Sequence, residues 1–300
     1  MNERPTLRQA AYALLYLLPA LAVVFIFTLY PIVKSFDISL YTKYNFYKNI
    51  VFERGFGNYV TMVNDPEFWQ SLRNTAVFVV GTVPLTMLIS LAIAMLLTSN
   101  IKGRDFFRSI YFLPVVTSVV AVSLVWKWIF HTDYGLLNEM LGWFGIGRIG
   151  WLTTPEWAMP SLIIFSIWKG LGYNVIIFLA GLQSIDKQMY LAARVDGARP
   201  WQRFRRITLP LLSPTTFYIS IVSLITSVKV FDEIFAMFGG IASHGGPGRS
   251  AMTIVYYIFE KFYVENKFGL ASAASYALFV ITLLFTLIQM YIARKRVHYT

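Results

Sequence analysis

Six apolar runs divide this chain of 300 residues and constrain its fold more than any other feature. They lie at about residues 12–33, 74–97, 109–130, 160–182, 211–230 and 271–292. Each is close to the roughly 20 residues that an α-helix needs to cross a bilayer. Backbone groups in lipid must form their hydrogen bonds within the spanning segment, so each run is predicted to be a helix. We therefore expect an all-α, polytopic membrane protein with six transmembrane helices.

The composition agrees with lipid as the main solvent. The chain is 57% apolar and 14% charged, whereas a soluble domain carries roughly 25% charged residues. The net charge of +11 is spread between apolar runs rather than over one soluble face, so membrane lipid is expected as a partner and nucleic acid is not. There is no cysteine and only three scattered histidines, so neither a disulfide nor a metal site is expected.

The distribution of Lys and Arg predicts the orientation. If the N-terminus is inside, the inner segments hold 14 basic residues and the longer outer segments hold 9. Cytoplasmic loops carry the excess of positive charge, so both termini are expected in the cytoplasm. The chain is then a cytoplasmic tail at 1–11, a transmembrane domain at 12–292 and a second cytoplasmic tail at 293–300.

The chain shows no energy source of its own. We find no phosphate-binding loop, no Ser-His-Asp set and no paired carboxylates within the apolar runs. The chain is therefore not expected to be an enzyme with an ATPase site of its own, and if it pumps a solute, the energy must come from another chain or from an ion gradient. A gradient-driven secondary sugar carrier is the alternative, although no repeat of halves and no deeply placed carboxylate supports it.

A lysine in the fourth run marks a candidate substrate path. Lys169 lies near the middle of that run, where an ionisable side chain indicates function by default. Aromatic faces beside amide and ammonium donors suit a sugar, and the lysine also suits an acidic group. An equally open interpretation is that Lys169 bonds only within the helix bundle. Asp232 at the outer mouth is a possible gate, although pairing of Asp232 or Glu233 with Lys229 is favoured. The candidate path comprises Trp126, Trp168, Lys169, Tyr173, Asn174 and Asp232.

The outer segments are rich in aromatic residues and contain one glycine-rich stretch. The aromatic residues at about 34–73 and 131–159 fit an interfacial belt, or alternatively a docking surface for an external partner. The stretch 238–248 lacks the Lys-Ser/Thr that phosphate binding needs, so we expect a flexible or sharply turned loop there.

The polar segment 183–210 between the fourth and fifth runs is basic and amphipathic. Its residues Ala192-Ala193, Gly197, Ile207 and Leu209-Pro210 resemble, at the full spacing, the EAA loop of binding-protein-dependent ABC importer permeases. Asp196-Gly197-Ala198 is similar to the sugar-importer form of that loop. The sequence departs from the pattern at Leu191, where the family has glutamate. The likeness covers nearly the whole chain and is to the carbohydrate group, with its maltose-type and glycerol-phosphate-type permeases.

The resemblance implies a specific assembly. It implies a second homologous permease chain as heterodimer partner, an external or periplasmic solute-binding protein and a cytoplasmic ATPase dimer. That dimer binds ATP and Mg, so this chain needs no cofactor. The substrate is expected to be an oligosaccharide or a sugar derivative, including acidic ones. The protein is expected in the plasma or inner membrane of a bacterium or archaeon.

The resemblance also implies how the ATPase drives transport. Two short helices of the segment 183–210 would sit in a cleft of the ATPase, with Gly197 at the turn between them and Pro200 beginning the second. Leu191 cannot make the ionic contact of the family glutamate, so an apolar contact or the second permease is expected to replace it. The coupling residues are expected to be Leu191, Ala192, Ala193, Asp196, Gly197, Arg203, Phe204, Ile207, Leu209 and Pro210.

Overall fold

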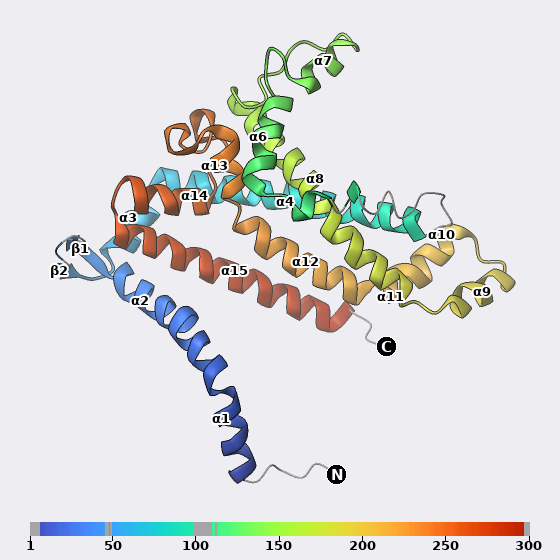
Figure 1. Cartoon of the computed structure of the whole chain (residues 1–300), viewed down its shortest axis with the longest axis horizontal. Coiled ribbons are helices and arrows are strands. Elements are labelled where there is room, and N and C mark those ends of the chain that lie inside the picture. The colour runs from blue at the N-terminus through green and yellow to red at the C-terminus, as the bar shows by residue number, and fades with distance from the viewer. Residues whose placement is uncertain (1–6, 46–47, 49, 99–109, 112, 297–300) are drawn as a thin grey trace.

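The computed structural model describes residues 7–45, 48, 50–98, 110–111 and 113–296. Its long helices α4, α8, α12 and α15 run side by side along the longest axis of the molecule (Figure 1). Helix α4 packs against α8 and α12, and α15 packs against α2 and α3. Helix α1 diverges from this bundle, so its side chains are exposed in the isolated chain.

The helices and strands follow one another in a fixed order. The N-terminal helical stretch comprises α1 (Leu7–Val24), a π-helical turn (Phe25–Leu29) and α2 (Tyr30–Ser39), and it is followed by β1 (Tyr41–Asn45), β2 (Ile50–Arg54), α3 (Gly57–Val63) and α4 (Pro66–Thr98). The middle of the chain forms α6 (Val119–Ile129), α7 (Leu136–Gly142), α8 (Pro155–Gln183), α9 (Lys187–Val195), α10 (Pro200–Arg203), a π-helical turn (Phe204–Thr208), α11 (Leu209–Leu211) and α12 (Ser213–Val228). The last part forms α13 (Asp232–Phe238), short 3-10 turns (Gly240–Ser243 and Pro247–Arg249), α14 (Ile254–Phe259), a π-helical turn (Glu260–Val264) and α15 (Phe268–Arg296).

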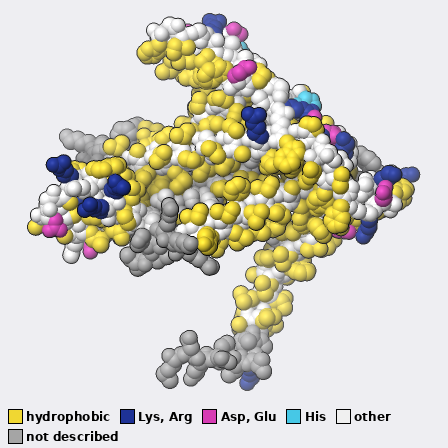
Figure 2. Space-filling view, turned by 180° about the vertical axis from the view of Figure 1, so that it is seen from behind, with side chains coloured by type: hydrophobic (Ala, Val, Ile, Leu, Met, Phe, Trp, Pro, Cys, Tyr) yellow, Lys and Arg dark blue, Asp and Glu magenta, His cyan; other side chains and the backbone are white. Residues whose placement is uncertain are grey.

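Among the residues that the structure describes, four helices are long and apolar enough to cross a membrane. They are Tyr12–Ser39, Pro66–Thr98, Pro155–Gln183 and Phe268–Ala293. A fifth candidate is the pair Pro200–Leu211 and Ser213–Val228, which is bent by 63°. Figure 2 shows that apolar side chains cover the middle of the long helices, whereas Lys and Arg gather at the two ends. This arrangement is the one that a bilayer crossing the bundle requires.

The third apolar run departs from the prediction of one continuous helix over 109–130. The helical turn before it ends at Val116, and α6 starts only at Val119. Between them Ser118 has φ −59° and ψ 130°, which is not helical. The hydroxyl of Thr117 donates to the carbonyl of Pro114 at 3.0 Å, so the side chain satisfies a backbone group at the break. Residue 109 itself lies outside the described residues.

The prediction of a purely helical chain is also corrected. Strands β1 and β2 form a two-stranded antiparallel sheet, in which Tyr41 is opposite Arg54 and Asn45 is opposite Ile50. The guanidinium of Arg54 lies 4.9 Å from the centre of the Tyr41 ring. The apolar runs gave no signal for this hairpin because it lies wholly in the first outer segment.

Several hydroxyl side chains inside the long helices are satisfied locally. The hydroxyls of Thr75, Thr86 and Thr282 each donate to the carbonyl four residues earlier, at 2.7–2.8 Å. A hydroxyl that is paired in this way does not carry the cost of an unsatisfied polar group in lipid. Ser and Thr are therefore compatible with the apolar helices and remain able to accept a further hydrogen bond.

The glycine-rich stretch is sharply turned, which was one of the two expected outcomes. Gly245 has φ +77°, and a Cβ there would lie 2.7 Å from the Cα of Met252. Its carbonyl accepts a hydrogen bond from the amide of Ala251 at 3.0 Å. Asn74 on α4 donates to the carbonyls of Arg249 and Met252, both at 3.0 Å. The turn is thus fixed to the outer part of α4.

Buried ion pairs join the N-terminal end of α4 to the turn that follows α14. The ammonium of Lys261 is 6% exposed and donates to Glu67 at 2.9 Å and to Glu265 at 2.6 Å. Tyr257 donates from its hydroxyl to a carboxylate oxygen of Asp65 at 2.7 Å. Because Asp65 and Glu67 are nearly 200 positions from Tyr257 and Lys261, these bonds join distant parts of the chain at one end of the bundle.

The ion pairs shift the pKa of Glu265. Burial alone raises the pKa of this carboxyl, but the hydrogen bonds and charges of Lys261 and Lys267 outweigh it and hold the pKa below its usual 4.5. A carboxyl whose pKa is lowered by folding stabilises the fold above its usual pKa. That stabilisation is lost as the pH falls through the lowered value.

We predict that a Gly269→Ala substitution destabilises the protein. A Cβ at this position would lie 2.5 Å from the carbonyl oxygen of Tyr41 and 2.4 Å from the amide nitrogen of Asn58. That amide donates to the carbonyls of Ser39 and Tyr41, so the joint between β1, α3 and α15 must open, at a cost of about 1–3 kcal/mol. The melting temperature in detergent, followed by tryptophan fluorescence, should fall. Gly142→Ala is the control because no atom lies within 4 Å of its added Cβ; equal melting of the two variants would contradict the prediction.

We predict that a Glu265→Gln substitution flattens the acid dependence of stability. The wild-type melting temperature should fall as the pH drops below about 5, through the usual pKa of 4.5 and then through the lowered value, because the carboxylate becomes protonated. The amide cannot titrate, so the variant should be less stable at neutral pH and should lose less on acidification. Glu53→Gln is the control, because Glu53 is 56% exposed in its pair with Lys43 and exposed pairs contribute little. Parallel acid profiles of the wild type and the Glu265→Gln variant would show the prediction to be wrong.

Candidate functional site

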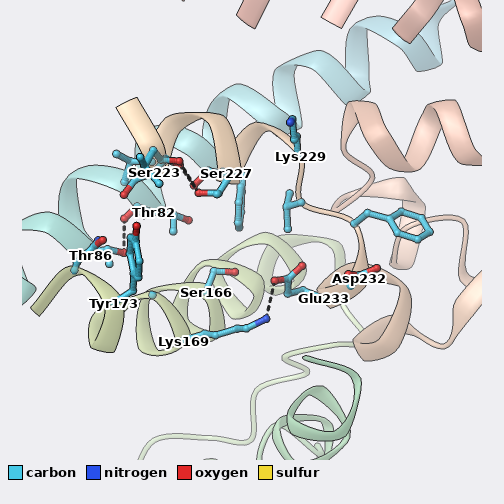
Figure 3. A pocket seen from close by; sticks show the side chains of 18 of the residues that line it. Thr82, Thr86, Ser166, Lys169, Tyr173, Ser223, Ser227, Lys229, Asp232 and Glu233 are labelled. Carbon is cyan, nitrogen blue, oxygen red and sulfur yellow. Dashed lines mark hydrogen bonds and ion pairs between the residues drawn. The ribbon is translucent and has the colours of Figure 1, made fainter. Parts of the chain in front are cut away.

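A cavity of about 580 Å³ lies among helices α4, α8, α12 and α13. Helix α8 contributes Ser166, Lys169, Gly170, Tyr173 and Asn174, and α4 contributes Phe78, Thr82, Val83 and Thr86. The C-terminal part of α12 and the start of α13 supply Val222, Ser223, Thr226, Ser227, Lys229, Val230, Phe231, Asp232 and Glu233, and Val115 completes the lining. Figure 3 shows side chains from these elements around one space.

Hydroxyl groups dominate the polar part of the lining. Thr82 and Ser166 have hydroxyl oxygens that are buried without any hydrogen-bond partner in the described structure. Thr86 and Thr226 donate to their own helix, which leaves their lone pairs free to accept. A buried polar group without a partner is unfavourable unless a ligand or water supplies one. The lining therefore fits a ligand with many donor and acceptor groups.

The cation in the cavity has a partner that the sequence analysis did not assign. The ammonium of Lys169 on α8 lies 3.4 Å from a carboxylate oxygen of Glu233 on α13, and their side chains are 21% and 19% exposed. Figure 3 shows the two side chains pointing toward each other. The sequence analysis favoured a pairing of Asp232 or Glu233 with Lys229. That prediction is wrong for Glu233, which pairs with Lys169. The break after α12 turns the start of α13 back toward α8.

The structure brings together four of the six candidate path residues. Lys169, Tyr173, Asn174 and Asp232 line the cavity. The hydroxyl of Tyr173 lies 3.4 Å from that of Tyr218 on α12, and Asn174 is 4% exposed.

The two tryptophans lie elsewhere. Trp126 and Trp168 pack against each other, with ring centres 5.3 Å apart. Trp126 also contacts Phe130 and Phe165 in the outer hydrophobic core. They support the wall of α8 rather than line the space beside it.

A second candidate site is the segment at the other end of the bundle. Helix α9 begins with Asp186 as N-cap, whose carboxylate accepts from the amide of Gln188 at 2.9 Å. Such a cap satisfies one of the free amides of the first turn. The amide of Arg199 donates to the side chain of Gln202 at 2.8 Å, and Pro200 occupies the first turn of α10, where proline is tolerated.

Gly197 forms the turn between these two helices, as expected. Its φ is +71°, a conformation that glycine adopts without the steric cost that a Cβ brings. The amide of Gly197 donates to the carbonyl of Arg194 at 3.0 Å, and that of Ala198 donates to Ala193 at 2.9 Å. These bonds close α9 in the manner of a C-terminal capping motif. Asp196 is the C-cap residue beside it.

The segment is fastened to the bundle by packing and one hydrogen bond. The hydroxyls of Tyr190 and Thr208 lie 3.0 Å apart and join α9 to the π-helical turn. Tyr190 and Ile207 pack against the inner hydrophobic core, which includes Leu182 and Leu212. Packed side chains therefore connect α9 to the start of α12.

The outward face of the segment is apolar and exposed. Leu191 is 57% exposed, Val195 89% and Trp201 66%. Ala192 is also exposed, whereas Ala193, Arg203, Phe204 and Pro210 are half-buried and Leu209 is 38% exposed. Trp201 contacts Phe204 with ring centres 5.4 Å apart. Exposed apolar side chains beside basic ones are typical of a surface that binds another protein.

Some features of both sites were missing from the sequence analysis. The hydroxyls of Thr82, Ser166 and Ser223 were overlooked, although serine and threonine within apolar runs were a visible signal. Glu233 was considered only with Lys229, because the break after α12 was not predicted. Within the described residues, no group of three His, Asp or Glu side chains is arranged to hold a metal ion.

Comparison with known sequences identifies related proteins. Residues 86–298 match the family described as "Binding-protein-dependent transport system inner membrane component". The lactose transport system permease protein LacF of Rhizobium radiobacter is 38% identical over 285 residues, covering 94% of each chain. The trehalose/maltose transport system permease protein MalF of Thermococcus litoralis is 34% identical over 289 residues, covering 96% of each.

Solved structures agree with the sequence comparison. A bacterial ABC transporter involved in the import of the acidic polysaccharide alginate contains a chain that matches with a TM-score of 0.81 and 27% identity, over 95% of both chains. A bacterial alginate ABC transporter in complex with an alginate pentasaccharide-bound periplasmic protein matches with a TM-score of 0.80 and 27% identity, over 95% of this chain and 94% of that one.

Proposed function

Because the chain belongs to the family of inner-membrane components of binding-protein-dependent transport systems, we propose that it is the permease subunit of an ATP-driven carbohydrate importer. The observation that carries the substrate class is the cavity. Its lining combines hydroxyls of Thr82, Ser166 and Ser223 with the ring of Tyr173, a combination suited to the hydroxyl rim and apolar faces of a sugar. Lactose and trehalose/maltose permeases among the relatives support the same class.

The importer needs further chains. A second permease would close the open side of the cavity, and an ATPase dimer would bind ATP and Mg. A solute-binding protein would deliver the sugar from outside, as the alginate transporter with its periplasmic protein illustrates for a relative. We place the assembly in the plasma or inner membrane of a bacterium or archaeon, with six spans and both termini in the cytoplasm. The third span would include the break before α6.

The segment containing α9 is proposed to couple ATP hydrolysis to transport. Its exposed apolar residues Leu191, Val195 and Trp201 would bind a cleft of the ATPase, and the apolar contact of Leu191 would replace the ionic contact of the family glutamate. When the ATPase dimer closes on ATP, α9 would move as a rigid body. The bond between Tyr190 and Thr208 and the packing of Ile207 support transfer of that motion to α12.

Helix α12 also lines the cavity at its far end, through Ser223 and Ser227. One helix thus links the coupling segment to the substrate path. Movement of α12 would change the opening of the cavity between the two sides of the membrane, in step with the ATPase.

We predict that a Gly197→Asp substitution abolishes substrate-stimulated ATP hydrolysis while the chain still inserts into the membrane. The residue must adopt φ +71°, and a carboxylate at the C-terminal end of α9 opposes the helix dipole. Both effects distort the turn that holds α9 against the ATPase. We expect a loss of at least about 10-fold, equal to about 1.4 kcal/mol of coupling, measured in proteoliposomes that contain the whole importer.

The matched control is Gly145→Asp. Gly145 also has a positive φ, +73°, and nothing lies within 4 Å of an added Cβ, but it lies after α7 and far from α9 (Figure 1). This variant should hydrolyse ATP like the wild type. Wild-type hydrolysis by the Gly197→Asp importer would overturn the coupling role of this segment.

A further inference from the structure

The cavity holds a lysine whose charge is already cancelled. Lys169 reaches the cavity from the middle of α8, and Glu233 reaches it from the first turn of α13. Their charged atoms are 3.4 Å apart, and both side chains are about four-fifths buried. In such surroundings, opposite charges interact much more strongly than they do in water.

An unpaired lysine at this place would have a clear consequence for the ligand. A buried ammonium without a counter-charge is unfavourable, and it attracts any anion that can reach it. A sugar carboxylate would be such an anion. With Glu233 in place, the same carboxylate meets a lysine that is already paired and also meets a repelling negative charge.

The remaining charges on the lining do not alter this balance. Lys229 and Asp232 also lie on the cavity wall, and they carry opposite charges. In Figure 3 the ammonium of Lys229 points away from the pair formed by Lys169 and Glu233. The charged side chains of this wall are therefore two cations and two anions, with no net charge.

The uncharged part of the lining suits a neutral polyol. Among the residues that the structure describes, the buried hydroxyls of Thr82 and Ser166 have no partner, and a sugar hydroxyl can both donate to them and accept from them. Tyr173 is 41% exposed and offers an aromatic ring beside them. None of these groups needs a charged ligand.

We propose that Glu233 is a specificity-determining residue: by neutralising Lys169 it makes the cavity accept neutral oligosaccharides and exclude oligouronates. This inference rests on the proposed carbohydrate-importer function and adds the charge of the substrate to it. The role of Glu233 is to hold and cancel Lys169.

The test uses the complete importer in detergent, without the binding protein, so that selection by the permeases alone is measured. The probes are a panel of neutral trisaccharides of glucose, galactose and mannose, and trisaccharides of galacturonate, glucuronate and mannuronate. The wild type should bind at least one neutral trisaccharide, and every uronate at least about 10-fold more weakly. Glu233→Gln should shift the ratio of the two affinities toward the uronates by about 10-fold.

Two further variants keep the result interpretable. Lys169→Met with Glu233→Gln removes both charges and should restore the preference for the neutral sugar, which shows that the single variant acts through Lys169. Glu156→Gln, at the exposed start of the same helix α8, is the control and should have the same ratio of affinities as the wild type.

The outcomes separate the two proposals. If the wild type binds a neutral trisaccharide and Glu233→Gln leaves the ratio of the two affinities unchanged, the proposed role of Glu233 is overturned. The carbohydrate function is then unaffected. A wild type that prefers the uronates also overturns that role and leaves the carbohydrate function standing. Failure of the wild type to bind any saccharide of the panel counts against both.

Discussion

A backbone in lipid must satisfy its hydrogen bonds within its own helices, and the rest of this structure depends on that constraint. The long helices α4, α8 and α15 form most of their backbone hydrogen bonds internally, although Pro84 and Pro160 have no amide to donate, and several of their hydroxyls bond to the preceding turn. Irregular backbone is then tolerated only at the ends of the bundle or beside a cavity. The glycine-rich turn lies at one end, the turn at Gly197 at the other, and the break between α12 and α13 beside the cavity. The polar chemistry of the chain is found at these same places.

Helix α12 connects two of these places, the end of the bundle that carries the turn at Gly197 and the cavity. Its start follows the stretch Pro200–Leu211, from which it is bent by 63°, and its end carries hydroxyls that line the cavity. A helix cannot be compressed along its axis without breaking its hydrogen bonds, so displacement of one end moves the other. In the proposed importer this is the mechanical route from the ATPase to the sugar. The pair of Lys169 and Glu233 lies where that route reaches the cavity.

Much of the fold was predictable because it follows from hydrophobicity alone. Four of the six apolar runs correspond to long helices, and the pattern around Gly197 and Pro200 predicted two short helices and the turn between them. The break at Ser118 was not predicted, although Pro114 within the run was a signal for an interrupted helix. The hairpin at Tyr41 has no apolar period that separates it from a loop. Lys169 was found as a buried charge, but its partner Glu233 was not, because their contact depends on the direction of the chain after α12.

The central claim is that this chain is one subunit of an ATP-driven importer, with an exposed apolar surface on α9 that an ATPase covers. Native mass spectrometry of the tagged chain, purified from its own membranes in mild detergent, tests that claim most directly. The account predicts one copy of this chain together with one different permease and two copies of an ATPase. Recovery of this chain alone, or only with copies of itself, under conditions that preserve known importer complexes would contradict it.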